Sequence, residues 1–261
     1  MSYETVLYEP IGRIVKITMN RPEKMNAING MLAKELAAAF EAFEKDPELW
    51  VAVLTGAGEK SFSAGGDLKA MASGEMDMSG SGGGGMLGLF QNFITKPVIA
   101  AVNGFALGGG TELAMSCDLI VASEKANLGL PEVKRGIIAG GGGVLRLQRH
   151  MPLKVAMYYI MTGEPMTAEE ACRWGLVNKV VPHDQVVSAA IAMAEKICES
   201  APLSVRISKE IAYRSLDVPL TFPPTAWEIN SQFMGKLMQS EDAKEGPRAF
   251  AEKRMPVWKG R

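Results

Sequence analysis

Residues 97–113 read Pro97-Val-Ile-Ala-Ala-Val-Asn-Gly-Phe-Ala-Leu-Gly-Gly-Gly-Thr-Glu-Leu113, a continuous apolar run followed by a cluster of glycines and a glutamate. The run predicts a strand that is buried on both faces, as in a parallel sheet covered by helices. Similar short runs occur at 51–54 and 118–122. Helical patterns separate these strands, and the sequence therefore predicts an α/β fold.

Further elements are predicted on both sides of this stretch. Thr5–Tyr8 and Ile14–Met19 are expected to form a hairpin with its turn at Pro10-Ile11-Gly12, and Gly30–Lys45 has the apolar spacing of an amphipathic helix. After about residue 150 the only predicted strand is Leu176–Val181. Helical patterns dominate there, at 152–161, 167–173, 184–199 and 202–214.

Composition and charge favour an ordinary globular protein. The 261 residues include 28 basic and 29 acidic side chains, so the chain has no overall attraction for nucleic acid or an anionic membrane. No apolar run approaches the roughly 18 residues of a membrane helix. The N-terminus, with Glu4 and Glu9, lacks the pattern of a signal peptide. We therefore expect a cytoplasmic protein that binds neither membranes nor nucleic acid.

Cysteine and histidine usage argues against a metal centre. The three cysteines, Cys117, Cys172 and Cys198, have spacings that fit neither a disulfide framework nor a zinc site, and we expect them to be small buried residues. His150 and His183 lie in no metal or nucleophile motif. The sequence predicts no bound metal.

Most of the 28 glycines lie between Gly56 and Gly143. The segment Ser73–Gly88 has a linker composition and is expected to be a mobile loop or lid. Its Gly80–Gly85 part matches GxGxxG without a preceding strand, so a dinucleotide site is rejected. Residues 56–61 lack the Gly-Lys-Ser/Thr ending of a phosphate loop, which excludes that reading as well.

Two other glycine clusters, Phe62–Leu68 and Gly104–Leu113, each follow an apolar strand. Ligand sites gather at such strand ends, and N–H groups at a helix start are unpaired and partly positive. The clusters therefore suit an oxyanion site. An alternative is that the glycines only permit tight turns or close packing.

Two glutamates occur in apolar surroundings near these clusters. Glu112 follows the triple glycine, and Glu132 follows Pro131. Burial would raise the pKa of each carboxyl toward the range useful for proton transfer. Taken singly, either glutamate could instead be structural, for example a helix cap.

Together these residues resemble the enoyl-CoA hydratase/isomerase (crotonase) family along almost the whole chain. That resemblance implies a crotonase-like spiral of ββα units with a C-terminal helical region, divided into a core at 1–198 that carries the site and an oligomerisation region at 199–261. It is carried by Asn20-Arg-Pro22, Phe62–Leu68, Pro97–Glu112, Pro131-Glu132, Gly142-Gly143, Ser240–Gly246 and Ala249–Arg254.

The resemblance also implies an activity. The backbone N–H groups of Gly66 and Gly109 would form an oxyanion hole for the thioester carbonyl of an acyl-CoA. Glu112 and Glu132 would hold a water between them, Glu112 as base toward Cβ and Glu132 as the proton donor to Cα. Isomerases of this fold commonly keep one acid of the pair, so both together favour an enoyl-CoA hydratase. Coenzyme A is then part of the substrate, and no separate cofactor is expected.

For coenzyme A binding, the resemblance implies one stretch of the same chain and two residues of a neighbouring subunit. Family members assemble as trimers or dimers of trimers, in which Phe250 and Lys253 of a neighbour would touch coenzyme A. Alternatively, Lys253 only favours the end of a helix. The residues of the same chain are Ala27, Ala64, Gly66, Asp67, Leu68, Lys69 and Gly109.

Some features leave the reaction and substrate open. The chain has Ala139-Gly-Gly-Gly-Gly143 where many family members have Pro-Gly before Gly-Gly, in a loop near the acyl group. Residues 130–147 and 256–261 resemble the carnitinyl-CoA dehydratase branch, whose quaternary ammonium substrate would need an aromatic or acidic lining. Isomerase, hydrolase or decarboxylase chemistry is an alternative. RNA binding would need a basic face, for which Arg146–Arg149 and Lys253-Arg254 are short candidates.

Overall fold

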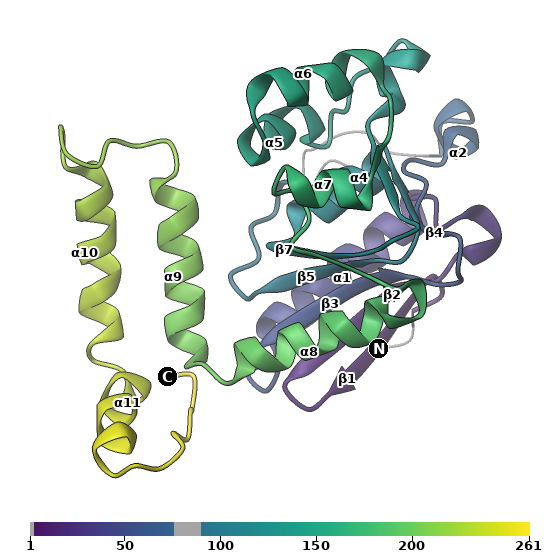
Figure 1. Cartoon of the computed structure of the whole chain (residues 1–261). Coiled ribbons are helices and arrows are strands. Elements are labelled where there is room, and N and C mark those ends of the chain that lie inside the picture. The colour runs from purple at the N-terminus through teal and green to yellow at the C-terminus, as the bar shows by residue number, and fades with distance from the viewer. Residues whose placement is uncertain (1–2, 76–89) are drawn as a thin grey trace. The chain divides into compact units, whose positions relative to one another are not determined.

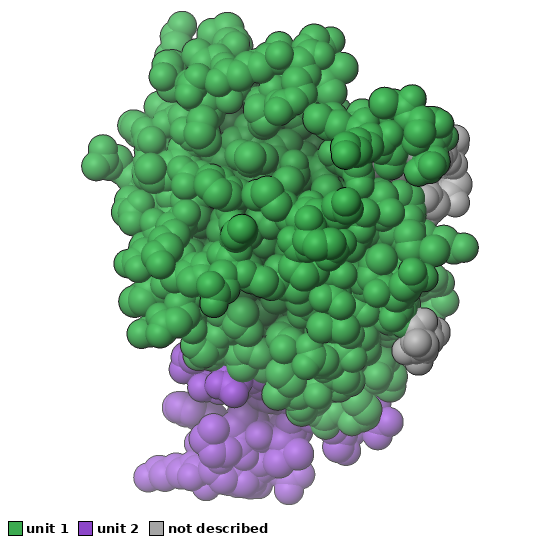
Figure 2. Space-filling model, turned by 90° about the vertical axis from the view of Figure 1, so that its right-hand side faces the viewer, with its two compact units in different colours: residues 1–93, 98–194 green, residues 94–97, 195–261 purple. Residues whose placement is uncertain are grey.

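The computed structural model describes residues 3–75 and 90–261 (Figure 1). The chain divides into two compact units, residues 1–93 with 98–194 and residues 94–97 with 195–261 (Figure 2). Residues 76–88 of the expected lid, including Gly80–Gly85, lie outside the described residues. Ser73, in the described part, ends helix α2 (Leu68–Ala72).

A six-stranded sheet forms the centre of the first unit. Strands β3 (Val51–Gly56) and β5 (Val98–Val102) lie in its middle, and every residue of both is buried. All neighbours pair in parallel except the β1–β2 hairpin. The predicted α/β class with buried parallel strands is confirmed. The order is β1 (Val6–Ile11), β2 (Ile14–Met19), β3, β5, β7 (Leu119–Ser123) and β10 (Lys179–Val181).

The predicted turn of the first hairpin was wrong by two residues. Pro10 and Ile11 belong to β1 and pair with Val15 and Ile14, so the turn is Gly12-Arg13. Proline is compatible with this strand because β1 lies at the edge of the sheet, where a missing N–H costs no ladder bond. Gly12 has φ +59°, a conformation that glycine adopts without steric cost.

A second sheet of four short strands was not predicted. Three of its strands each follow a strand of the large sheet, in the order β3–β4, β5–β6 and β7–β8. Strands of two or three residues are too short to show an alternating pattern. The repeated strand pairs agree with the expected spiral of ββα units. The sheet contains β4 (Ser61–Ser63), β6 (Phe105–Leu107), β8 (Asn127–Gly129) and β9 (Met166–Thr167).

Helices of the first unit cover the sheets and carry the site. Helix α1 (Gly30–Lys45) has the predicted bounds, begins at an Asn29 cap that accepts from the Leu32 N–H, and buries its apolar face. Helix α4 (Gly109–Ser116) follows β6, and the 3-10 helix η2 (Pro131–Arg135) follows β8. The others are η1 (Pro22–Lys24), α5 (Gly143–His150), α6 (Leu153–Thr162), α7 (Ala168–Arg173), η3 (His183–Gln185) and α8 (Val186–Cys198), which continues into the second unit.

The second unit is helical. Helices α9 (Pro202–Ser215) and α10 (Thr225–Leu237) pack side by side, followed by α11 (Glu241–Ala251) (Figure 1). No helix in residues 3–75 and 90–261 has the length and apolar character needed to cross a bilayer. None of the three cysteines forms a disulfide, but only Cys117 is buried, and Cys172 and Cys198 are partly exposed. Burial was therefore predicted correctly for one of the three.

Candidate active site

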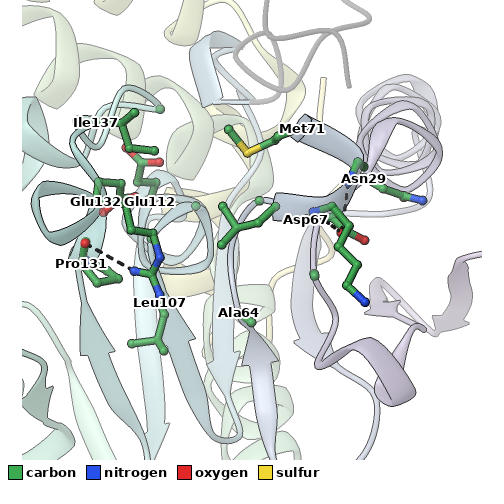
Figure 3. Close-up of a pocket in the computed structure, with 18 of the residues that line it drawn as sticks. Asn29, Ala64, Asp67, Met71, Leu107, Glu112, Pro131, Glu132 and Ile137 are labelled. Atoms are coloured by element: carbon green, nitrogen blue, oxygen red, sulfur yellow. Dashed lines mark hydrogen bonds between the residues drawn. The ribbon is translucent and has the colours of Figure 1, made fainter. Parts of the chain in front are cut away.

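A cavity of about 1220 Å³ lies within the first unit, where α2, α4 and η2 begin (Figure 3). It brings together all four proposed catalytic residues, Gly66, Gly109, Glu112 and Glu132. Figure 3 shows Glu112 and Glu132 beside each other on one side of the cavity, with Asn29 and Asp67 on the other side.

The two glycine clusters approach each other closely at this cavity. A Cβ added to Gly65 would lie 2.5 Å from the Leu107 carbonyl oxygen and 2.9 Å from the Gly109 nitrogen. Gly65 also has φ +88°. A side chain at this position would therefore separate the loop after β4 from the start of α4. Close approach of two backbones explains the glycine at 65.

The backbone N–H groups of Gly66 and Gly109 are candidate oxyanion donors. In the bridge between Ile28 and Gly66, Ile28 donates to the Gly65 carbonyl and accepts from the Asp67 N–H, so Gly66 keeps its own N–H. Gly109 is the first residue of α4, where an N–H has no acceptor within the helix. Within the described residues neither N–H donates to a protein acceptor. The partial positive charge at the helix start adds to their attraction for an anion.

Glu112 lies in the first turn of α4 with only 2% of its surface exposed. Its Oε1 accepts from the Gly143 N–H at 2.8 Å. Burial, with help from the negative charge of Glu132, raises the pKa of Glu112 to about 7, although N–H groups of Gly143 and Gly141 and the charge of Arg146 oppose the rise. A carboxyl with this pKa can exchange a proton near neutral pH.

Glu132 lies in η2 and is partly buried. Burial raises its pKa, opposed by a hydrogen bond from its own backbone and by the charge of Arg135. Its Oε1 lies close to Gly108, where an added Cβ would be 2.8 Å away. Its Oε2 is buried and has no hydrogen-bond partner among the described residues. A buried acceptor without a partner needs a water, a substrate or a proton.

The glycine run before α5 supports Glu112, a role that the sequence analysis missed. A Cβ on Gly141 would lie 2.6 Å from Glu112 Oε2 and 2.6 Å from the Phe90 ring. Gly140 and Gly141 also line the cavity. The sequence feature that could have indicated this support is the run of glycines just before a helix, because backbone N–H groups at such a place can bind a carboxylate.

The residues proposed for coenzyme A within the chain line the same cavity. Ala27, Ala64, Leu68 and Lys69 are joined there by Asp67, whose carboxylate caps α2. Cavity-lining Arg21 and Lys24 were not proposed as site residues. The sequence feature that could have indicated them is the pair of basic residues on either side of Pro22.

Arg21 fixes one side of the groove. Its guanidinium donates to the Ala27 carbonyl at 2.5 Å and to Asp67 at 3.3 Å. The charge of Asp67 is therefore compensated within the chain, and Lys24 and Lys69 also line the cavity, together with Glu75. The two lysines suit a phosphorylated ligand.

Other candidates are not among the described residues that line this cavity. Phe250, which is 87% exposed, and Lys253 belong to the second unit, at the end of α11 and just beyond it. The resemblance implies that these two residues contact the coenzyme A bound by a neighbouring subunit. That prediction therefore concerns an oligomer and not the single chain. Arg146 donates to the carbonyls of Gly141 and Phe90 and does not form an open basic face, which weakens the RNA-binding alternative.

The cavity lining also bears on metals and on the acyl group. The described residues contain no cluster of three or more His, Cys, Asp and Glu side chains suited to a metal ion. Of the described lining residues none is aromatic. The described lining therefore lacks the aromatic side chains that a quaternary ammonium group would favour, and its acidic side chains are Asp67, Glu75, Glu112 and Glu132.

Comparison with known proteins agrees with this geometry. Residues 11–261 match the model of the enoyl-CoA hydratase/isomerase family, and the chain belongs to that family. It is 48% identical over 254 residues to a carnitinyl-CoA dehydratase from Salmonella typhi, covering 96% of each protein.

Several solved structures resemble the structure of this chain. One is an enoyl-CoA hydratase from Mycobacterium tuberculosis H37Rv, which is 45% identical in sequence, superposes with a TM-score of 0.92, and matches over 98% of this chain and 99% of its own. A carnitinyl-CoA hydratase from Mycobacterium avium is 49% identical, with a TM-score of 0.77 and full coverage of both chains. The crotonase fold expected from the sequence is confirmed.

Proposed function

We propose that this enzyme adds water reversibly across the 2,3-double bond of an enoyl-CoA thioester by means of Gly66, Gly109, Glu112 and Glu132. The chain is a lyase of the hydratase/dehydratase kind, as its relatives indicate. One observation carries the assignment of residues: two carboxyls with raised pKa share a cavity with two backbone N–H groups that have no acceptor among the described residues.

The N–H groups of Gly66 and Gly109 polarise the thioester carbonyl. Negative charge develops on its oxygen when water attacks Cβ, and the two donors stabilise that charge. One such donor contributes about 2.7–4 kcal/mol in comparable sites. Because the donors are backbone groups held by a bridge and a helix start, they need little reorganisation during the reaction.

The two glutamates divide the proton transfers. Glu112 takes a proton from the water while the water oxygen bonds to Cβ of the substrate, and Glu132 gives a proton to Cα. In dehydration the same residues exchange roles. Mutual repulsion in a shared buried site favours one ionised and one protonated carboxyl, which is the state that each direction requires.

Coenzyme A would lie along Ala27, Ala64 and Leu68, with Lys69 near a phosphate. In a trimer or dimer of trimers, Phe250 and Lys253 of a neighbour would complete that groove. We further propose a cytoplasmic enzyme of fatty acid or carnitine metabolism, in which the substrate is a short enoyl-CoA.

A panel of enoyl-CoA esters tests the reaction and the substrate together. The enzyme is mixed with crotonyl-CoA or crotonobetainyl-CoA, and loss of the ultraviolet absorbance of the conjugated thioester reports hydration. We expect a decrease with at least one ester and its reversal from the hydrated product. Product analysis distinguishes hydration from other reactions that remove this absorbance: an isomerised, hydrolysed or decarboxylated product in place of the hydrated ester would replace the proposed reaction.

A further inference from the structure

Arg146 bridges two parts of the chain behind the acidic pair. The residue lies in the first turns of α5 and is partly buried. Its Nη1 donates to the Gly141 carbonyl at 2.9 Å, and its Nη2 donates to the Phe90 carbonyl at 2.6 Å. A planar guanidinium can hold two such acceptors in fixed directions, which an ammonium cannot do.

The loop that Arg146 holds is the loop that binds Glu112. Oε1 of Glu112 accepts from the Gly143 N–H, and Gly141 contributes a second backbone N–H to the carboxylate. Gly142, between them, leaves room for the guanidinium, because a Cβ there would lie 2.1 Å from Arg146 Nη1. Gly142 also has φ +102°. The glycine run and Arg146 therefore form one support for Glu112.

Four titratable groups interact at this support. Arg146 on α5 attracts the carboxylate of Glu112, and Glu132 on η2 repels it. His150, one turn further along α5, interacts electrostatically with Arg146. Arg146 is not among the described residues that line the cavity.

We propose that Arg146 is a positioning residue for hydration, which fixes the Gly141–Gly143 backbone and thereby the orientation of the Glu112 carboxylate. This inference rests on the proposed role of Glu112 as the base. It predicts three properties of Arg146 variants. The chemical step is slower and substrate binding is retained. Where the positive charge is lost, the protonation of Glu112 also changes.

Two variants separate the guanidinium geometry from its charge. Arg146→Lys keeps the charge without the planar fork, and Arg146→Gln removes the charge. We expect kcat for hydration to fall about tenfold to a hundredfold in both, because a small displacement of a catalytic group has effects of this size. KM should stay within about twofold of the wild-type value.

The pH profile gives the second measurement. In Arg146→Gln the acidic limb of kcat should move to higher pH, since the charge that favours the ionised Glu112 is gone. In Arg146→Lys the limb should stay near its wild-type position. Arg149→Gln on the same helix is the matched control, because Arg149 donates to the Leu145 carbonyl of its own helix; its kcat and pH profile should be unchanged.

A double variant shows whether Arg146 acts through Glu112. In a Glu112→Gln background, Arg146→Lys should cause little further loss of the residual rate. A full additional loss there would mean that Arg146 acts elsewhere, and wild-type kcat in folded Arg146→Lys would overturn the proposal even if the Gln variant does not fold. Failure of the proposed function is distinguishable, because it would leave the wild-type enzyme itself without hydration activity.

Discussion

At the scale of single residues, the acidic pair determines which reaction is possible. Replacing Glu112 or Glu132 with glutamine removes a proton carrier while keeping nearly the same shape. Each variant should therefore lose about 10²–10⁴-fold in the rate of crotonyl-CoA hydration. Calorimetric titration with a non-reactive acyl-CoA should show nearly unchanged affinity. Full activity in either variant would remove that residue from the mechanism.

The pKa of Glu112 also predicts a pH dependence of stability. A folded-state pKa of about 7, above the ordinary 4.5, means that the folded protein binds more protons than the unfolded chain between these values. Unfolding free energy should therefore fall as pH rises through this window, by about 3 kcal/mol from this group. Urea unfolding at about pH 5 and about pH 8 measures the slope, which should be much smaller in Glu112→Gln.

The backbone donors need a different substitution, because a side-chain change does not remove an N–H. Gly109→Pro deletes the donor at the first position of a helix, where proline is tolerated. We expect kcat to fall about 10²–10³-fold. Gly109→Ala keeps the N–H and is the control for added bulk. Equal rates in the two variants would exclude Gly109 as an oxyanion donor.

Single residues also show where sequence reasoning succeeds. Gly66, Gly109, Glu112 and Glu132 could be proposed because special backbone positions and glutamates in apolar runs are visible in the sequence. Support from Arg146 could not be proposed, since it depends on which carbonyls a side chain meets after folding. From the sequence alone, Arg146 could be described only as part of the short basic stretch Arg146–Arg149.

At the scale of elements, strong local patterns predicted what the chain forms. Helix α1 could be bounded because its apolar spacing is regular and Asp46-Pro47 ends it. Strands β3 and β5 are buried on both faces and therefore continuously apolar. The second sheet could not be predicted, because its strands owe their conformation to pairing with partners far away in the sequence.

The glycine loop that precedes α5 gives a separate prediction. In Gly141→Ala the new Cβ would press on Glu112 Oε2 and the buried Phe90 ring, and neither can move far. We expect kcat to fall at least about tenfold. Gly140→Ala is the neighbouring comparison, since its Cβ comes no closer than 3.9 Å to the nearest atom, and its loss should be smaller. Steady-state rates of folded variants decide between a support for Glu112 and a plain turn.

At the scale of the whole molecule, the described residues that line the cavity all belong to the first unit, and two of the proposed coenzyme A residues belong to the second. In the proposed assembly, Phe250 and Lys253 of a neighbouring copy would contact the coenzyme A bound in this cavity. The division into a core at 1–198 and an oligomerisation region at 199–261 therefore stays a prediction about assembly. Sedimentation of a species near 28 kDa would contradict it.

Mixing two impaired variants tests the shared site directly. Phe250→Ala with Lys253→Ala should raise KM for the enoyl-CoA while leaving kcat nearly unchanged, because these side chains would touch coenzyme A and not the reacting carbons. Glu112→Gln supplies a subunit with intact Phe250 and Lys253 but no base. When the two proteins are dissociated and reassembled together, some sites combine the intact Glu112 of one subunit with the intact Phe250 and Lys253 of the next. Hydration at low substrate should then exceed the sum of the separate activities, and a merely additive rate would mean that each chain binds its substrate alone.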